Sequence, residues 1–474
     1  MLEPNAIYEM VKCNSDLLCH NEILIDIFEG NLLTYIAKDM DRQFDDRMLK
    51  DCMARVVPIN ILPKIIDKLT NIYQTTVTRE VFNGAKKDED LLAWYIDKLD
   101  INAVFNDANE MFNLTKTALI QPFVYDKQPC VRVILSDKFV VYSTNPVKPA
   151  EPTGIILLMG KRDDVDIYYH YTADKIEAID SRGDIRRDIM EEMGNPDGVN
   201  PIGRLPFTYV NQSRYRVRPK PDSDILQLTK VIPIMFTDLN VAAMYQSFSI
   251  IYGIDINDEN LKMSPNAFWS LKSDITTDTK PEIGMLKPAV DYSQVIQLIE
   301  TQLSLWMGTK GIRASTVGSL TSDNYASGLS KVIDEMDTYE AREKQVGYFE
   351  AAERDFWSLT LQSLHPYWVQ SGQIDNRTLF DPTASVRTSF ATQLPTQSRG
   401  DVVRDLRDER DAGFISRKRA MAKINPEMSS RELDELMQEI DEEKEEAATF
   451  AVTSGGITTP DEEQAIADDE GENV

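Results

Sequence analysis

The sequence predicts an α+β fold that is mainly helical. Apolar residues recur every three or four positions across 61–72, and a helical pattern also runs from Ser327 to about His365. Between these regions, short β-branched and aromatic runs alternate with turn-forming pairs such as Asp126-Lys127, which is typical of strands joined by turns. We therefore expect helices, then a sheet, then more helices.

The first 120 residues are expected to be helical. Asn60 is a candidate N-cap for the 61–72 pattern, and Pro63 falls in its first turn, where proline is tolerated. Two further helical patterns cover 91–105 and 108–120, and the periodicity changes near Gln121. The strands expected after this change are 122–125, 130–135, 139–142, 154–159, 166–171 and 207–210.

A long helix is expected to begin after Pro221, because Asp222-Ser223-Asp224 supplies N-cap side chains and an apolar stripe follows. Pro233 lies within that stripe and should kink the helix. A turn-rich insert, 253–290, leads to a second helix at 292–307, and the two helices are expected to pair.

A polar, uncharged stretch at 315–322 separates the second helix of this pair from the long helical pattern. Pro366 marks the expected end of that pattern, because the residue before a proline disfavours helix. Three shorter helices are expected in 400–447, followed by a disordered acidic tail at 448–474.

The charge balance is strongly acidic. There are 51 Lys and Arg residues against 78 Asp and Glu residues, for a net charge of −27. Residues 432–474 alone hold 16 acids and one base. Such a surface repels phosphate at long range, which argues against a protein that coats DNA or RNA.

Targeting and redox signals point to a reducing compartment. Residues 1–9 contain acids and a proline where a secretory signal would have bases followed by an apolar run. Because no window of 18 apolar residues occurs, we expect no membrane-spanning helix. Four cysteines in 474 residues are too few for a disulfide scaffold.

A nucleotide-binding loop is not expected. Gly154 and Gly160 follow a strand pattern, but a phosphate loop has four residues between its glycines and ends in Lys-Ser or Lys-Thr. Here five residues separate the glycines and Arg162 follows Lys161. We interpret 154–162 as a hairpin strand.

Catalytic and metal motifs are also not found in the sequence. His20, His170 and His365 lie in separate segments without a nucleophile motif, and we interpret them as structural or surface residues. Residues 163–166 lack the glycine and the final glutamate of a calcium loop and are expected to form a solvated turn. We expect no enzyme activity, cofactor or metal. A weaker alternative is a hydrolase that uses His170 with Asp163 or Asp166.

Several segments, in this order along the chain, resemble the portal proteins of tailed bacteriophages, the head-to-tail connectors of dodecameric type. The passage through 264–269, 280–288 and 292–306 looks like the clip-to-stem region of that family. Tyr325-Ala326-Ser327-Gly328-Leu329 leads into a long helix, and Ile424-Asn425-Pro426-Glu427 precedes an acidic helix, as at the crown end of the family. The resemblance covers about residues 55–447 in element order; the tail beyond Phe450 departs from it.

The resemblance implies a portal-type subunit with wing, stem helices, a small β-containing clip, a long tunnel helix and a helical crown. The implied regions are 1–221 wing, 222–252 stem helix, 253–290 clip, 291–312 stem helix, 313–326 tunnel loop, 327–399 long helix and wing return, 400–447 crown, and 448–474 disordered acidic tail.

The resemblance also implies a function: a dodecameric ring at one capsid vertex, through which the terminase packages double-stranded DNA, which is retained and later ejected. Implied partners are further copies of the chain, the terminase large subunit, head-to-tail adaptor or tail proteins, and major capsid and scaffolding proteins, with no membrane. The expected location is the virion, and the host cytoplasm during assembly. The alternative is a capsid scaffold or head-tail adaptor that forms no channel.

Two groups of residues are predicted to carry this function. Because the clip is too small to bury its aromatic side chains, we expect them to pack on a neighbouring subunit or a docked partner. The clip residues are Asn266, Phe268 and Trp269. The tunnel-loop residues predicted to face DNA are Lys310, Arg313, Ser315, Thr316, Gly318, Ser319, Thr321 and Ser322.

Overall fold

The computed structural model describes residues 4–42, 46–247, 250–254, 282–286, 291–311, 328–391, 399–424 and 433–442. The chain divides into two compact units, Met1–Gln393 and Leu394–Val474. With 53% helix and 18% strand, it has the mainly helical α+β fold that the sequence predicts. The predictions for 255–281, 313–326 and 448–474 lie outside the described residues.

The N-terminal part of the first unit is helical, as expected, but the boundaries differ. A break follows Lys98, because the side chain of Asp100 caps a new helix by accepting from the Ala103 N–H at 3.4 Å. That helix ends where Lys116 adopts a left-handed φ of 65°, so the expected helix over 108–120 is wrong beyond Thr115. The helices are α1 (Pro4–Cys13), α2 (Ser15–Phe28), α3 (Leu32–Asp41), α4 (Asp46–Met53), α5 (Leu62–Leu69), η1 (Ile72–Gln74), α6 (Lys86–Lys98) and α7 (Ile101–Thr115).

Two strands that the sequence analysis missed form a sheet of their own. β1 (Val77–Phe82) pairs antiparallel with β11 (Ser385–Phe390), with Val77 opposite Phe390. β1 lies within the region expected to be helical. Its partner is about 300 residues away, so no local hairpin pattern marks it.

Two further sheets match the expected strands. One has the order β3-β2-β8, from β2 (Thr117–Tyr125), β3 (Gln128–Ile134) and β8 (Thr208–Asn211). The other has the order β4-β5-β6-β7, from β4 (Phe139–Tyr142), β5 (Gly154–Arg162), β6 (Val165–Thr172) and β7 (Ile176–Asp180), and α8 (Arg187–Glu192) follows it. Asp126-Lys127 and Asp163-Asp164 form the two hairpin turns, all with positive φ, which confirms both predicted turns.

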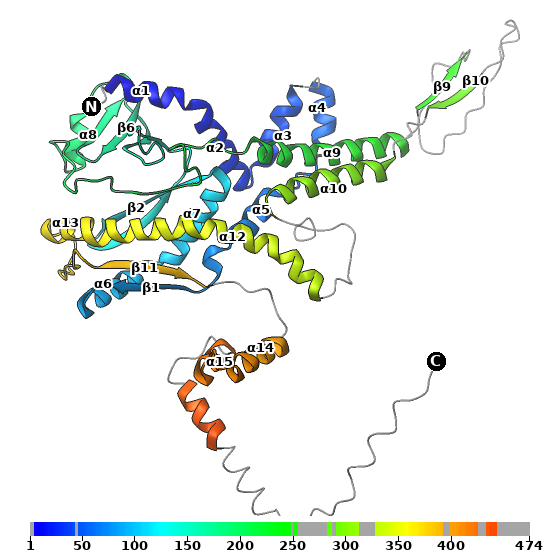
Figure 1. Ribbon diagram of the computed structural model, residues 1–474. Helices are drawn as coiled ribbons and strands as arrows, with labels where there is room; N and C mark the ends of the chain where they lie inside the picture. Colours follow the sequence, from blue (N-terminus) through cyan, green and yellow to red (C-terminus); the bar gives the residue numbers. More distant parts are fainter. Residues whose placement is uncertain are drawn as a thin grey trace, which may run out of the picture. The chain divides into compact units, whose positions relative to one another are not determined.

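The two expected stem helices lie side by side (Figure 1). α9 (Ser223–Ser247) begins at the predicted cap but ends five residues before position 252, and β9 (Ile250–Ile254) follows. β9 pairs antiparallel with β10 (Glu282–Leu286), and α10 (Tyr292–Thr309) returns beside α9. Pro233 lies inside α9, as the sequence indicates.

By length and composition, one helical stretch among the described residues, Ser223–Ala243, could cross a membrane, whereas the sequence analysis expected none. Within the fold, this stretch packs Ile232 and Leu239 with Ile299 of α10. Its Lys230 Nζ lies 2.6 Å from the Asp39 carboxylate. Apolar and charged side chains of this stretch therefore have partners inside the protein.

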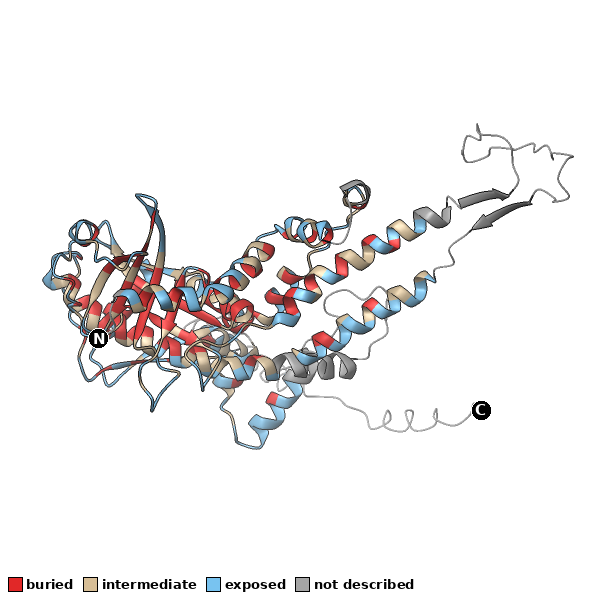
Figure 2. Ribbon diagram, turned by 90° about the horizontal axis from the view of Figure 1, so that it is seen from above, coloured by how far each residue is buried: buried red, intermediate tan, exposed pale blue. Residues whose placement is uncertain are grey.

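A long helical rod crosses the first unit (Figure 1, yellow). It consists of α12 (Gly328–Trp357), a π-helical segment η2 (Ser358–Leu364) and α13 (His365–Gln370). The expected end before Pro366 is wrong, because the proline occupies the first turn of α13, where its missing N–H breaks no hydrogen bond. Buried residues line much of this rod (Figure 2), and Phe349, Phe356 and Trp357 belong to the main core.

The second unit is described by three helical segments, as the sequence predicts for 400–447. They are α14 (Arg399–Asp411), α15 (Arg417–Ile424) and residues 433–442. Leu406, Ala420 and Leu433 are buried, one from each segment.

Candidate functional site

The pair α9–α10 is held by a thin apolar contact. Ile232, Leu239 and Ile299 are buried between the helices. Other apolar side chains of the same helices point outward: Val231 is 41% exposed, Leu298 49% and Leu305 69%. The pair therefore has an inner face that joins its two helices and an outer face with unburied apolar side chains.

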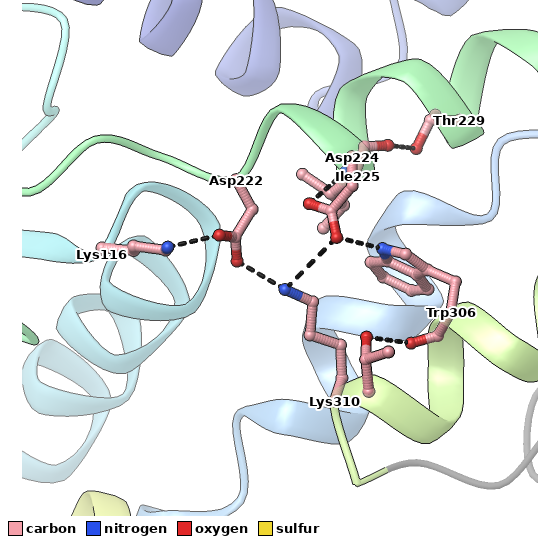
Figure 3. A network of polar contacts seen from close by, with 8 residues as sticks. Lys116, Asp222, Asp224, Ile225, Thr229, Trp306 and Lys310 are labelled. Atoms are coloured by element: carbon pink, nitrogen blue, oxygen red, sulfur yellow. Dashed lines mark hydrogen bonds and ion pairs between the residues drawn. The ribbon is translucent and has the colours of Figure 1, made fainter.

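The base of the pair is held by a polar network that joins three distant parts of the chain (Figure 3). The Asp222 carboxylate, just before α9, accepts from Lys310 Nζ at 2.5 Å, where α10 ends, and from Lys116 Nζ, where α7 meets β2. Asp224 accepts from the indole Nε1–H of Trp306 at 2.9 Å. One carboxylate between two lysines thus fixes both helix ends to the sheet.

The charge state of Asp222 follows from this geometry. Burial alone would raise its pKa, but the hydrogen bonds from Lys116 and Lys310 outweigh burial, and the net effect lowers the pKa below its ordinary value of 3.8. Asp222 is therefore ionised at neutral pH. Lys310 also stacks over the Trp306 ring, with Nζ 5.7 Å from the ring centre.

A cleft of about 900 Å³ lies beside this network. Its walls come from the end of α7, the base of the α9–α10 pair, and residues 340–348 of α12. Phe112, Trp306 and Tyr348 are aromatic side chains on these walls, while Lys116, Lys310 and Lys344 supply cations. The cleft thus separates the end of α10 from the long helix that follows it in the chain.

The long helix is anchored by a fully buried carboxylate. Glu353 of α12 accepts from Arg79 Nε and Nη2, both at 2.7 Å, from Tyr73 Oη at 3.0 Å, from Trp357 Nε1 at 3.1 Å and from Thr388 Oγ1 at 2.9 Å. Burial and the nearby Glu353 charge raise the pKa of Tyr73 well above its ordinary value. This network ties α12 to η1, β1 and β11.

The histidines lie in structural settings. His365 is fully buried: its Nε2 is 2.9 Å from the Thr378 carbonyl, and its Nδ1 is 2.8 Å from Tyr95 Oη. Because Nε2–H must donate to the carbonyl, Nδ1 accepts from the tyrosine, and the ring is neutral. Burial lowers the pKa of His365, and burial together with Lys230 lowers that of His20.

The postulated pairing of His170 with Asp163 or Asp166 is not what the structure displays. His170 Nε2 lies 2.8 Å from Tyr142 Oη, and Nδ1 lies 3.7 Å from the Glu177 carboxylate. Asp163 instead accepts from Arg186 at 3.1 Å. Burial lowers the pKa of His170, although Glu177 acts in the opposite direction.

Of the residues predicted to carry function, the structure describes Lys310. Its ammonium group contacts Asp222 and, at 3.8 Å, Asp224, so it is engaged within the protein. Contact of Lys310 with DNA stays a prediction. The other predicted tunnel-loop and clip residues lie outside the described residues: Arg313, Ser315, Thr316, Gly318, Ser319, Thr321, Ser322, Asn266, Phe268 and Trp269.

Sequence reasoning identified Asp222 and Asp224 only as capping residues and missed their partners. Lys116 lies 106 positions from Asp222, and Trp306 lies 82 positions from Asp224. A non-glycine residue in the left-handed region, here Lys116, marks the helix-to-strand junction, but the sequence carries no local sign of it.

No protein-family model matches the chain, and no curated protein sequence matches it. Similar solved structures include the neck of an empty GTA particle computed with C6 symmetry, at 8% identity and a TM-score of 0.45, over 77% of this chain and 90% of that chain. The neck of a native GTA particle computed with C12 symmetry has 9% identity and a TM-score of 0.42, over 77% and 90%. The virion of a native gene transfer agent particle has 8% identity and a TM-score of 0.42, over 78% and 91%.

Proposed function

We propose that this chain is the subunit of a portal ring, through which double-stranded DNA is packaged into a capsid, retained and ejected. The observation that carries the proposal is an order of elements. An antiparallel pair of helices, α9 and α10, is connected through paired strands β9 and β10 and is followed by the long helix α12. The portal resemblance of the sequence implies this order as stem, clip, stem and tunnel helix.

The outer face of the helix pair supports assembly into a ring. Val231, Leu298 and Leu305 are apolar and exposed, although both helices have a buried inner face. A neighbouring subunit would remove these side chains from water, at about 25 cal/mol per Å² of apolar area. Closed rings form when such head-to-tail contacts repeat by rotation, and the resemblance implies twelve copies.

The acidic composition supports passage of DNA. Every lysine or arginine that contacts a phosphate releases counterions, and the resulting attraction would act as friction on moving DNA. A net charge of −27 keeps such contacts few. In this proposal residues 313–326 face the DNA, and Phe268 and Trp269 bind the terminase, an adaptor or a neighbouring subunit. The proposal assigns no catalytic step to the chain.

Ring formation is tested by electron microscopy and native mass measurement of the purified protein. We expect rings with a central hole. L298E/L305E should give monomers, because it places two carboxylates in the subunit contact, whereas V147E, at an exposed loop position, should leave the rings intact. Monomers or filaments of the unmodified protein would favour the channel-free scaffold or adaptor.

DNA passage is tested by a packaging assay with S319K/T321K, which adds two positive charges per subunit to the predicted tunnel loop. Packaging should slow and its salt dependence should steepen, while ring assembly stays normal. S319N/T321N is the neutral control. An unchanged packaging rate at low salt would contradict contact between this loop and DNA.

A further inference from the structure

The second unit carries a local excess of positive charge in a very acidic protein. Residues 399–424 contain eight arginines and lysines and five acids, a net charge of +3, while the whole chain carries −27. Half of these bases lie on α15, a helix of eight residues without an acid. This concentration is unexpected for a surface that serves only to keep the protein in solution.

The bases of α15 lie beside an exposed aromatic side chain. Phe414, just before the helix, is 87% exposed. It lines a cleft of about 620 Å³ together with Ile415, Arg419, Ala422, Lys423 and Glu409. Arg419, Ala422 and Lys423 are spaced three and four positions apart, so they share one face of the helix. We call Phe414, Arg417, Lys418, Arg419 and Lys423 the α15 surface.

The helical segment 433–442 neutralises the other bases of this surface. Asp441 lies 2.5 Å from Arg417 Nη1, and Asp434 lies 2.6 Å from Lys418 Nζ. The two aspartates are seven positions apart and therefore lie on one face of their helix. Segment 433–442 contains five acids and no base, so its addition changes the net charge of the described helices from +3 to −2.

The cleft side of the α15 surface is less restrained. The nearest carboxylate to Lys423 Nζ is that of Glu409, at 3.7 Å, and both side chains are about half exposed. Such an exposed pair contributes little and is screened by salt. Two cations and an exposed ring thus remain accessible from solvent.

We propose that the α15 surface binds the phosphate backbone of DNA, and that segment 433–442 weakens this binding by holding Arg417 and Lys418. Arginine and lysine side chains bind phosphate oxygens, and aromatic rings beside them contact bases or sugars of a nucleic-acid strand. The charge complementarity is specific to this surface, because the rest of the protein repels polyanions. The proposal is independent of the portal ring and adds a second place where the chain meets DNA.

The test measures binding of a fluorescent 30-base-pair DNA to the full chain by anisotropy, at several salt concentrations. D434N/D441N frees Arg417 and Lys418. The affinity should rise, and the slope of log affinity against log salt should steepen by about 0.9 for each additional phosphate that the protein neutralises. R419Q/K423Q should lower the affinity and flatten the slope by a similar amount.

A matched variant separates the specific ion pairs from net charge. E439Q/E442Q makes the same charge change on the same helix, but at positions other than the two that pair with α15. An equal rise in affinity for E439Q/E442Q and D434N/D441N would overturn the role of segment 433–442. Circular dichroism checks that both variants keep their helix content.

Two more arms identify the ligand. A single strand of 30 nucleotides, compared with the duplex, distinguishes the two sources of phosphate, and F414A should weaken binding of the single strand more, because its bases can stack on the ring. Poly-glutamate is the competing anion. Unchanged DNA binding by R419Q/K423Q, or equally tight binding of poly-glutamate, would overturn the proposal.

Discussion

Two carboxylates organise the first unit in opposite ways. Glu353 is fully buried and accepts hydrogen bonds from four side chains of the core. Asp222 is 36% exposed and is held by two lysines at the base of the α9–α10 pair. A buried ion pair resists salt but is costly to break, whereas a partly exposed pair is weaker and screened. The comparison indicates that α12 is anchored more firmly than the helix pair.

The largest effect is expected from Arg79→Met. This change leaves the Glu353 carboxylate buried without its cation, and it should lower the free energy of unfolding by about 3 to 5 kcal/mol. Denaturant unfolding of the purified protein measures it. The double variant R79M/E353M removes both charges and should be less destabilised than R79M alone. A double variant that is worse than both single variants would contradict this account.

A smaller effect is expected from Ile299→Ala in the α9–α10 pair. The lost apolar contact and the resulting cavity should cost about 2 to 4 kcal/mol. Hydrogen exchange should show the loss in α9 and α10, while the α12 amides near Glu353 stay protected. Gln297→Ala, an exposed position of the same helix, is the control. Equal loss of protection in α12 would mean that the two regions unfold together.

The smallest effect is expected from Asp222→Asn, about 1 kcal/mol, because the site is partly exposed and screened. The folded state lowers the pKa of Asp222 below 3.8. The contribution is therefore complete above pH 3.8 and is lost as the pH falls through the lower folded pKa.

Hydrogen exchange in the first turn of α9, measured against pH and salt, checks this prediction. The variant should exchange faster than the unmodified protein at neutral pH, and the difference should shrink in high salt and in acid. K310M, which removes one of the two lysines, should give an intermediate result. A difference that persists in strong acid would show that Asp222 acts by packing or hydrogen bonding alone.

The sequence predicts elements well where the signal is local. The start of α9 follows from Asp222-Ser223-Asp224, and the two hairpin turns follow from their turn-forming pairs. Strand β1 fails this criterion, because its partner and the Glu353 anchor lie about 270 to 310 positions away. Short alternating segments depend on such distant partners more than helices do.

The candidate site was predictable only in part. Lys310 was identified as a basic residue at the end of the second helix, but the sequence could not show that its charge is paired with Asp222. Lys116 and Trp306 join the network through the packing of α7, α9 and α10, and no spacing rule connects residues so far apart. Side-chain networks of this kind require the tertiary structure.

The π-helical segment η2 has a consequence for insertions and deletions. Its wider turn holds one residue more than an α-helical path of similar length, and successive residues of an α-helix are about 100° apart around the axis. Deletion of one residue within 358–364 would therefore rotate everything that follows. His365 would turn away from Tyr95 and Thr378, although the rod itself would stay helical. This short segment sets the angular phase between the two ends of the rod, so homologous chains should vary in length at the exposed turn after α13 before they vary here.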